Sequence, residues 1–286
     1  MENKVIISNI QITSPDKILI KDPRVTKKDL AIYYEKVSLR MLPFIKKRII
    51  SSVRCPDGVS AKCFYKKHLE AKSKGINQIN IASSSGKKED YYYITDVKGV
   101  ISEVQMNTIE FHIWGSTVSS IDTPNMIVFD LDPDEKVKLS SVRKAATDLK
   151  SILDSLKLKS FLKVSGSKGY HIVIPLSIKT NWESVRTFSK NIALLMSEKW
   201  PEKYTASSSK LLRKNKIFID WMRNIKGATS ISPYSVRAKN GARVSMPIAW
   251  SELGLIKPDQ ITMNEAIKRL NKKDPWQGFD KVKQGI

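Results

Sequence analysis

Several residue types are scarce in this chain, and their scarcity excludes whole classes of protein. Only two cysteines occur, Cys55 and Cys63, which is too few for a disulfide-stapled scaffold. Their spacing from His68 fits no common zinc motif, so we expect ordinary thiols and no zinc site. No apolar run approaches the roughly 18 residues that cross a bilayer, and the N-terminus lacks the pattern of a secretory signal. We therefore expect a soluble intracellular protein with no membrane partner.

Acidic residues are also scarce, because the 286 residues include 28 Asp and Glu against 50 Lys and Arg. The difference gives a formal net charge of +22, which indicates an acidic polyelectrolyte as partner, with nucleic acid the first candidate. The hydrophobic fraction of 41% is ample for a packed core, and no repeat or Pro/Gly-rich linker divides the chain.

Helix-type and strand-type patterns alternate along the chain, which predicts a mixed α/β fold. Apolar residues recur at helical spacing in three segments, which start near Thr26, Ser140 and Asn181. Five further runs are rich in β-forming residues, and the candidate functional residues lie on or beside them: 126–132, 161–164, 170–176, 217–222 and 244–250.

Two aspartates lie near the end of the apolar run IVFDLDPDE at 127–135. Asp130 and Asp132 are two residues apart on a predicted strand, so their side chains emerge on the same face. Carboxylates this close repel each other, and a divalent cation such as Mg²⁺ or Mn²⁺ would relieve the repulsion. The competing interpretation is a solvated turn favoured by Pro133.

Two other motifs share this pattern only in part. An EF-hand loop would need glycine where Glu135 stands and glutamate where Ser141 stands, so that interpretation fails. Phosphatases of the haloacid dehalogenase type also place Asp-x-Asp after an apolar strand, but their pattern usually continues to Thr or Val where this chain has Asp134. The phosphatase option is therefore weakened but stays open.

The segment KVSGSKGYHIVIP at 163–175 predicts a tight turn between two strands. Gly166 and Gly169 flank this turn, and such a turn lets backbone N–H groups and Lys168 approach a phosphate closely. His171 follows on the next strand, where it is placed to contact the same group. An ordinary hairpin is the competing interpretation.

The stretch from Lys203 to Arg243 contains ten basic residues and a single acid, Asp220. Many of these cations are expected to be solvated surface, but a lone carboxylate on an apolar strand needs another explanation. It either pairs with an arginine or completes a metal site begun by Asp130 and Asp132. Three carboxylates around divalent metal, with lysine and arginine for the phosphates, are what nucleotidyl transfer requires.

The segments DLDP, SGSKGYH and FIDWMRN, in this order, resemble the polymerase domain of the ligase D type, in the archaeo-eukaryotic primase superfamily. That domain acts in prokaryotic non-homologous end joining. Segments 15–37, 56–68 and 229–253 resemble further blocks of the family, so the resemblance covers nearly the whole chain. It implies one primase-polymerase catalytic domain over residues 1–286 without an attached ligase or nuclease domain. The implied fold is of the primase type, with two mixed sheets flanked by helices and the active site in the cleft between the sheets.

The resemblance also implies roles for individual residues. Asp130, Asp132 and Asp220 would be the catalytic carboxylates that hold Mn²⁺ or Mg²⁺. Contacts to the incoming nucleoside triphosphate would come from His112, Ser165, Lys168, His171 and Arg237.

For DNA, the resemblance assigns Phe64 and Tyr65 to stacking on the template base at the break, where the family commonly has two phenylalanines. Stacking is indifferent to base sequence, which suits an enzyme that meets arbitrary DNA ends. The pocket for a downstream 5′-phosphate would contain Lys17 and Lys27, and a loop that bridges DNA ends would contain Lys210 and Arg213.

The expected function is template-dependent gap filling at DNA double-strand breaks, with a preference for ribonucleotides and a two-metal mechanism. The implied partners are DNA ends or gapped DNA with a 5′-phosphate, NTP or dNTP, a separate DNA ligase and a Ku-like protein. The implied location is the cytoplasm, at the nucleoid. A stand-alone primase-polymerase that starts chains de novo is the alternative within the fold, and a non-catalytic DNA-end-bridging module is the alternative of another class.

Overall fold

The helix that the sequence places after Thr26 is α1 (Lys27–Ile45) in the computed structural model, which describes residues 4–69, 73–82, 88–177 and 179–286. Thr26 is the N-cap of this helix, which agrees with the predicted start near Thr26. Its Oγ1 accepts the N–H of Asp29 at 3.1 Å, and Asp29 Oδ2 accepts the N–H of Thr26 at 2.9 Å. This capping box fixes the first turn, and the apolar face that follows is buried.

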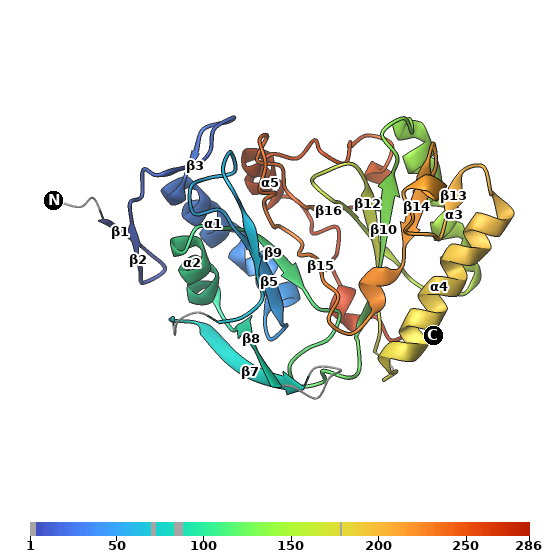
Figure 1. The fold of residues 1–286 in the computed structure, drawn as a ribbon, viewed down its shortest axis with the longest axis horizontal. Coiled ribbons are helices and arrows are strands. Elements are labelled where there is room, and N and C mark those ends of the chain that lie inside the picture. The colour runs from blue at the N-terminus through green and yellow to red at the C-terminus, as the bar shows by residue number, and fades with distance from the viewer. Residues whose placement is uncertain (1–3, 70–72, 83–87, 178) are drawn as a thin grey trace. The chain divides into compact units, whose positions relative to one another are not determined.

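The chain divides into two sets of segments, each of which packs mainly within itself. Unit 1 comprises Met1–Trp114, Ile231–Ser245 and Thr262–Lys272. Unit 2 comprises Gly115–Ser230, Met246–Ile261 and Lys273–Ile286. Each unit contains helices and a sheet, so the predicted mixed α/β class is confirmed (Figure 1).

A four-stranded sheet is the centre of unit 1, in the order β15–β9–β5–β6. The helices α1, α2 and α5 belong to the same unit, and α1 packs against the other two (Figure 1). The sheet strands are β15 (Ser230–Ile231), β9 (Thr108–Ile113), β5 (Ile50–Arg54) and β6 (Phe64–Lys66), and the two further helices are α2 (Val97–Gln105) and α5 (Met263–Arg269). Three two-stranded ribbons complete the unit: β1 (Lys4–Ile7) with β2 (Ile10–Thr13), β3 (Ile18–Ile20) with β4 (Val25–Thr26), and β7 (Ile76–Ala82) with β8 (Lys88–Ile94).

The two cysteines are joined in a disulfide, so the expectation of two ordinary thiols is wrong. Cys55 directly follows β5 and Cys63 directly precedes β6, and the antiparallel pairing of these strands brings both ends of the connecting loop together. The bond therefore closes the loop at its base, immediately before Phe64 and Tyr65. A spacing rule for zinc motifs carries no information about such a pairing.

Unit 2 is built on a six-stranded sheet in the order β13–β14–β10–β12–β11–β16. The neighbouring strands are antiparallel except for the parallel pair β13–β14, so this sheet is mixed. Its strands are β10 (Met126–Pro133), β11 (Phe161–Val164), β12 (Tyr170–Pro175), β13 (Tyr204–Thr205), β14 (Ile217–Asp220) and β16 (Pro247–Ile248).

Two long helices cover this sheet, α3 (Leu139–Ser155) and α4 (Trp182–Lys199). The helix α3 packs against β10 and β12, and α4 packs against β10 and β13 (Figure 1). Both helices start within one residue of the predicted positions. Four 3₁₀ turns lie between the larger elements: η1 (Leu211–Arg213), η2 (Met222–Asn224), η3 (Trp250–Glu252) and η4 (Phe279–Lys281), all in unit 2.

Two predicted strands are shorter than expected. The run 217–222 leaves the sheet after Asp220, because the side chain of Asn224 bonds to both the N–H and the C=O of Val128 at 2.8 Å and holds the chain in the turn η2. The run 244–250 contributes only Pro247 and Ile248 to a strand. Proline has no N–H for the ladder, which suits the sheet edge where β16 lies.

No helix in the described part of the chain combines the length and the apolar character that a membrane span needs.

Candidate active site

The three predicted metal carboxylates lie on two neighbouring strands of unit 2. β10 and β14 run antiparallel, and their register places Asp130 directly opposite Asp220. Asp132 lies two residues further along β10, so it emerges on the same face as Asp130. The sheet therefore brings together two carboxylates from a single motif and one from a segment about 90 residues away in sequence.

Two arginines form ion pairs with these aspartates. Arg213 Nη1 donates to Asp132 Oδ2 at 2.8 Å. Arg223 lies 3.0 Å from Asp220 Oδ2 through Nε and 3.5 Å from Asp130 Oδ2 through Nη2. Asp220 thus pairs with an arginine, as one interpretation expected, and also lies opposite Asp130, while its role in a metal site stays a prediction.

Burial makes the charged form of Asp130 unfavourable. Burial raises the pKa of Asp130 to about 6; Arg223 opposes this rise, and Asp220 and Asp132 add to it. Oxygen donors of this kind fit the chemistry of a hard divalent cation. Across the described residues, however, no group of three or more His, Cys, Asp or Glu side chains is arranged to hold a metal ion, and Asp130 and Asp132 are paired with arginines.

The predicted phosphate-binding turn follows β11 and returns along β12. Ser165 Oγ accepts the N–H of Ser167 at 3.1 Å and that of Gly169 at 3.3 Å, which closes the turn. Gly166 has a φ of +69°. A Cβ at Gly169 would lie 1.8 Å from the carbonyl oxygen of Leu131, so only glycine lets the turn lie against β10.

The residues after the turn reach the carboxylates. His171 lies opposite Asp130 in the β10–β12 register, and its Nε2 is 3.3 Å from Asp130 Oδ1. Lys168 is exposed and its Nζ is 3.2 Å from Glu135 Oε1. The structure therefore places the Ser-Gly-Ser-Lys-Gly-Tyr-His segment beside the predicted metal carboxylates, and the nucleotide contacts assigned to it stay predictions.

Sequence reasoning missed two cations that face this cluster. Lys163 is 1% exposed on β11, opposite His171, and its charge lowers the pKa of Asp130. A lysine inside the apolar run FLKV was an available signal for a buried charge. In the sequence Arg223 is one cation of a basic stretch, and the available signal was its position three residues after Asp220, the end of β14.

His112 and Arg237 belong to unit 1, where a third residue connects them. His112 Nε2 lies 2.8 Å from Glu110 Oε2, and Arg237 Nε lies 3.3 Å from Glu110 Oε1. Burial works to raise the pKa of Glu110, but the hydrogen bond with His112 and the charge of Arg237 outweigh it, and the pKa lies below its ordinary value. Glu110 did not figure in the sequence prediction, although Glu-x-His on a strand places both side chains on one face.

The predicted stacking pair lies on β6, an edge strand of the unit 1 sheet. Phe64 is 40% exposed and Tyr65 is 62% exposed, which is unusual for large aromatic side chains. The guanidinium of Arg54 lies 5.5 Å from the centre of the Phe64 ring, and the ring of Tyr65 lies 5.6 Å from that of His112. Both aromatics are therefore open to a base, as the prediction requires.

The two lysines predicted to bind a 5′-phosphate are neighbours in unit 1. The N–H of Lys27 donates to the carbonyl of Lys17 at 2.9 Å. Lys17 Nζ lies 3.6 Å from Asp57 Oδ1, whereas Lys27 Nζ donates to the carbonyl of Gln105 at 3.1 Å. Burial, with a smaller contribution from Lys17, lowers the pKa of Lys27. The two residues are therefore adjacent, and their role in binding a 5′-phosphate stays a prediction.

The residues of the predicted bridging loop differ in their surroundings. Lys210 is exposed, but Arg213 is turned toward Asp132, with its guanidinium 3.9 Å from the centre of the Phe218 ring. Arg213 therefore interacts with the carboxylate cluster in this arrangement.

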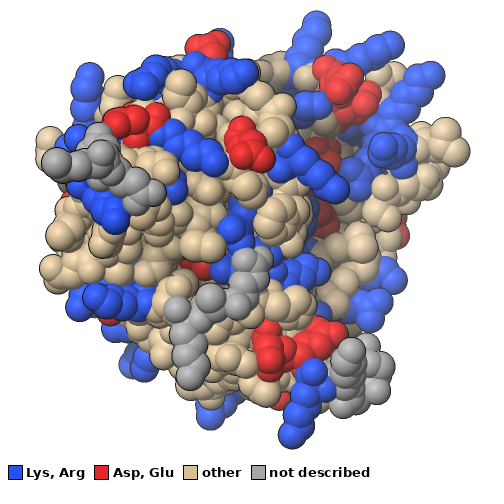
Figure 2. All heavy atoms as spheres, turned by 60° about the vertical axis from the view of Figure 1, so that its left-hand side comes forward, with Lys and Arg blue, Asp and Glu red and all other residues tan. Residues whose placement is uncertain are grey.

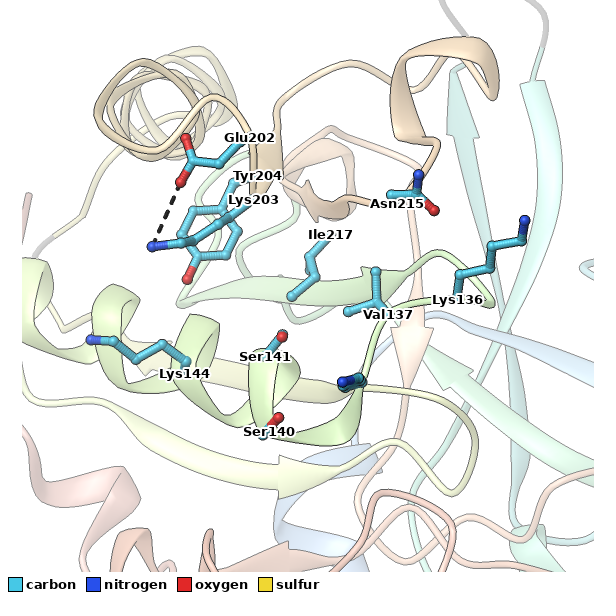
Figure 3. Close-up of a pocket in the computed structure, with 11 residues that line it drawn as sticks. Lys136, Val137, Ser140, Ser141, Lys144, Glu202, Lys203, Tyr204, Asn215 and Ile217 are labelled. Carbon is cyan, nitrogen blue, oxygen red and sulfur yellow. Dashed lines mark ion pairs between the residues drawn. The ribbon is translucent and has the colours of Figure 1, made fainter.

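A cavity of about 490 Å³ lies next to the N-terminal end of α3 in unit 2, and none of the predicted site residues lines it (Figure 3). Glu202 and Lys203 form an ion pair at 3.6 Å in its wall, whose other charged residues are Lys136, Lys138 and Lys144. The excess of cations is a property of the wider surface as well. On the face shown in Figure 2, Lys and Arg project at many places and Asp and Glu form a few small groups.

The family model described as LigD, primase-polymerase domain, matches residues 26–276 of the chain. The multifunctional non-homologous end joining protein LigD of Pseudomonas aeruginosa is 31% identical over 289 residues, which cover 99% of this chain and 34% of that protein. The bifunctional non-homologous end joining protein LigD of Bacillus subtilis is 30% identical over 272 residues, covering 94% of this chain and 44% of that protein. The chain thus spans between a third and a half of the length of these relatives.

A solved structure is similar over nearly the whole chain. The polymerase domain from Mycobacterium tuberculosis ligase D in complex with DNA superposes with a TM-score of 0.88 at 27% sequence identity. The match covers 95% of this chain and 98% of that domain. The similarity confirms the fold that the sequence motifs implied.

Proposed function

Because the chain belongs to the LigD primase-polymerase domain family and is therefore a nucleotidyltransferase, we propose that it fills gaps at DNA double-strand breaks during non-homologous end joining. The observation that carries this proposal is the cluster of Asp130, Asp132 and Asp220 beside the turn that holds Lys168 and His171. A carboxylate cluster next to a cationic turn is the arrangement that phosphoryl transfer from a nucleoside triphosphate needs.

In the proposed reaction, a primer 3′-hydroxyl attacks the α-phosphate of a bound nucleoside triphosphate, and pyrophosphate leaves. Asp130, Asp132 and Asp220 would hold two divalent metal ions, Mn²⁺ or Mg²⁺. Such ions, when bound, lower the pKa of the attacking hydroxyl and neutralise negative charge on the triphosphate.

The chain's own residues position the nucleotide in this proposal. One turn and the strand after it carry Ser165, Lys168 and His171. Their closeness in the chain would let them bind neighbouring phosphate oxygens. His112 and Arg237 are proposed as further contacts to the nucleotide. Ten basic residues between 203 and 243 are consistent with a polyanionic substrate.

DNA is the proposed template and primer, and the solved relative is itself a complex with DNA. Phe64 and Tyr65 would stack on the template base at the break. We propose Lys17 and Lys27 as contacts for the downstream 5′-phosphate, and Lys210 and Arg213 as residues of an end-bridging loop. A preference for ribonucleotides, a separate DNA ligase, a Ku-like protein and a place at the nucleoid are further parts of the proposal.

A gapped duplex with a primer 3′-end tests the function directly. Nucleotide incorporation should be measured with 5′-phosphate or 5′-hydroxyl at the gap, with ribo- or deoxynucleotides, and with Mn²⁺ or Mg²⁺. We expect the 5′-phosphate and ribonucleotides to be favoured. Asp220→Ala should abolish incorporation, whereas Asp154→Ala, which removes an exposed carboxylate paired with Lys150 on α3, should leave it unchanged.

The same assay separates the alternatives. Robust synthesis on a single-stranded template without a primer would assign the chain to primer synthesis. No incorporation by the unaltered protein would leave an end-bridging role in place of polymerisation. Full incorporation by Asp220→Ala would overturn the catalytic role of Asp220. Hydrolysis of a small phosphoester without DNA is what a phosphatase would give.

A further inference from the structure

Two adjacent leucines are exposed in the middle of one loop of unit 2. Leu211 is 89% exposed, more than any other large hydrophobic side chain among the described residues, and its neighbour Leu212 is 57% exposed. Both belong to the turn η1, within the loop 206–216 that joins β13 to β14. Leucines that are exposed singly are normal on a protein surface, whereas this pair forms a small continuous apolar surface that a partner can cover.

The backbone on both sides of the leucine pair is held by the rest of unit 2. On the side of β13, Trp221 Nε1 donates to the carbonyl of Ala206 at 3.1 Å. On the side of β14, the N–H of Asn215 donates to Asp134 Oδ2 at 2.8 Å, and the N–H of Asp134 donates to the carbonyl of Lys216 at 3.0 Å. Because the loop is anchored at both ends, a partner that covers the leucines has little backbone to order.

The charges around the leucine pair are all positive along the chain. No acidic residue lies between Lys203 and Asp220, and the loop carries four cations: Lys210, Arg213, Lys214 and Lys216. Arg213 is paired with Asp132, whereas Lys210 and Lys214 are exposed on either side of the turn. An apolar surface flanked by lysines complements nucleic acid, which offers phosphates to the lysines and flat, apolar base faces to the leucines.

Duplex ends are the part of DNA that such a surface fits. In an unbroken duplex each base pair is covered by the next one, so a side chain that inserts there must first separate the stack. The outer face of the terminal base pair is already uncovered, and leucines can pack on it without that cost. Contact with this face removes apolar area of both partners from water.

We propose that Leu211 and Leu212 bind the outer face of the terminal base pair at a DNA end, while the neighbouring lysines contact its backbone phosphates. Every base pair presents an apolar face, so this contact distinguishes an end from continuous duplex without reading the base sequence. The inference rests on the proposed function, to which it adds an apolar contact made by two residues that the sequence motifs did not single out.

Binding to an open duplex and to the same duplex closed at both ends tests the proposal. The closed form carries a non-nucleotide linker across each terminal base pair, which blocks the outer faces and keeps the phosphates. The open form carries 5′-hydroxyl groups, so that a 5′-phosphate contact does not contribute. Replacing Leu211 and Leu212 together by alanine should weaken binding to the open duplex about tenfold and leave binding to the closed duplex unchanged.

Leu39→Ala is the matched control, because Leu39 is 85% exposed on α1 of unit 1 and the change removes the same atoms. It should alter binding to neither duplex. Replacing Leu211 and Leu212 by methionine keeps the apolar surface and should preserve the preference for the open duplex. All three leucines are exposed, so the unfolding temperature should be nearly the same in every variant.

Salt dependence separates the role of the leucines from that of the lysines. The alanine variant of the leucine pair loses no phosphate contact, so the slope of log affinity against log salt concentration should not change. Lys210→Ala should instead reduce this slope by about one and weaken binding to both duplexes.

The proposal is overturned if the alanine variant binds the open duplex as tightly as the unaltered protein, or if it loses affinity equally for both duplexes. A DNA-free dimer in analytical ultracentrifugation that the alanine variant abolishes would also overturn it, because the leucines would then join two copies of the chain. None of these results prevents nucleotide incorporation at a primed gap. Failure of that incorporation in the unaltered protein would overturn the proposed function by itself, whatever the preference for ends.

Discussion

Removing the charge of Asp130 should make the metal-free protein more stable while it destroys activity. The pKa of this carboxyl group is raised by burial from its ordinary 3.8 to about 6, with Arg223 opposing the rise. Each pKa unit is equivalent to about 1.4 kcal/mol, so the ionised form lowers the free energy of unfolding by about 3 kcal/mol at most at neutral pH. Asparagine has the same shape and no charge, so Asp130→Asn should recover this amount.

The pH dependence follows from the sign of the change. The unfolded chain loses the proton of Asp130 at a lower pH than the folded chain does, so the free energy of unfolding falls between about pH 4 and pH 6. Above that range the loss is complete. Asp130→Asn should therefore match the unaltered protein near pH 4 and exceed it by about 3 kcal/mol near pH 8.

Urea unfolding in the presence of a chelator, followed by tryptophan fluorescence, measures this difference. Five of the six tryptophans belong to unit 2, so the signal reports mainly the unit that contains Asp130. Asp132→Asn is the control on the same strand. Its carboxylate is 48% exposed and accepts from Arg213, so its removal should bring no gain.

Two results would refute the reasoning about Asp130. One is a variant no more stable than the unaltered protein near pH 8, and the other is an equal gain near pH 4 and pH 8. Added Mn²⁺ should raise the stability of the unaltered protein but not that of Asp130→Asn, because the ion binds only the folded form of an intact site.

Three further outcomes are expected. Replacing Cys55 and Cys63 by serine should lower the free energy of unfolding by about 2.5 kcal/mol, because the unfolded chain is no longer restricted by the short closed loop. The urea midpoints of oxidised, reduced and variant protein measure this change, and equal midpoints would contradict it. Phe64→Ala and Tyr65→Ala should each weaken binding to a fluorescent gapped duplex by about 1–3 kcal/mol, with unfolding almost unchanged because both rings are exposed. A chelator should abolish nucleotide incorporation and Mn²⁺ should restore it; activity that survives exhaustive chelation would exclude the metal-dependent reaction.

Local signals explain which parts of the fold could be predicted. The N-cap at Thr26, the strand that ends at Pro133 and the turn between Gly166 and Gly169 each depend on residues within a few positions of one another. The motifs around them also led to the family, which the family model and the curated relatives confirm. The neighbouring positions of Asp130 and Asp220 needed this family pattern, because no local rule specifies that β14 pairs with β10.

Long-range contacts explain what the sequence did not reveal. Glu110 accepts a hydrogen bond from the N–H of Ala238, which is 128 residues away in sequence, and no local pattern predicts this contact. Arg223 could not be distinguished from the other cations of its stretch until the strand end placed it next to Asp220. The disulfide depends on the pairing of β5 with β6, and two cysteines on a loop of unknown shape do not predict it.

The strand β10 has a partner on each side, β12 and β14, whereas β6 pairs with β5 alone among the strands that the structure describes. Interior strands open only when much of their unit unfolds, while edge strands fray on their own. Backbone amides of β10 should consequently be among the last in unit 2 to exchange with deuterium, and those of β6 should exchange early. The carboxylates of the proposed site would thus lie on a strand that rarely opens, and the aromatic pair proposed to meet an irregular DNA end would lie on a strand that opens more easily.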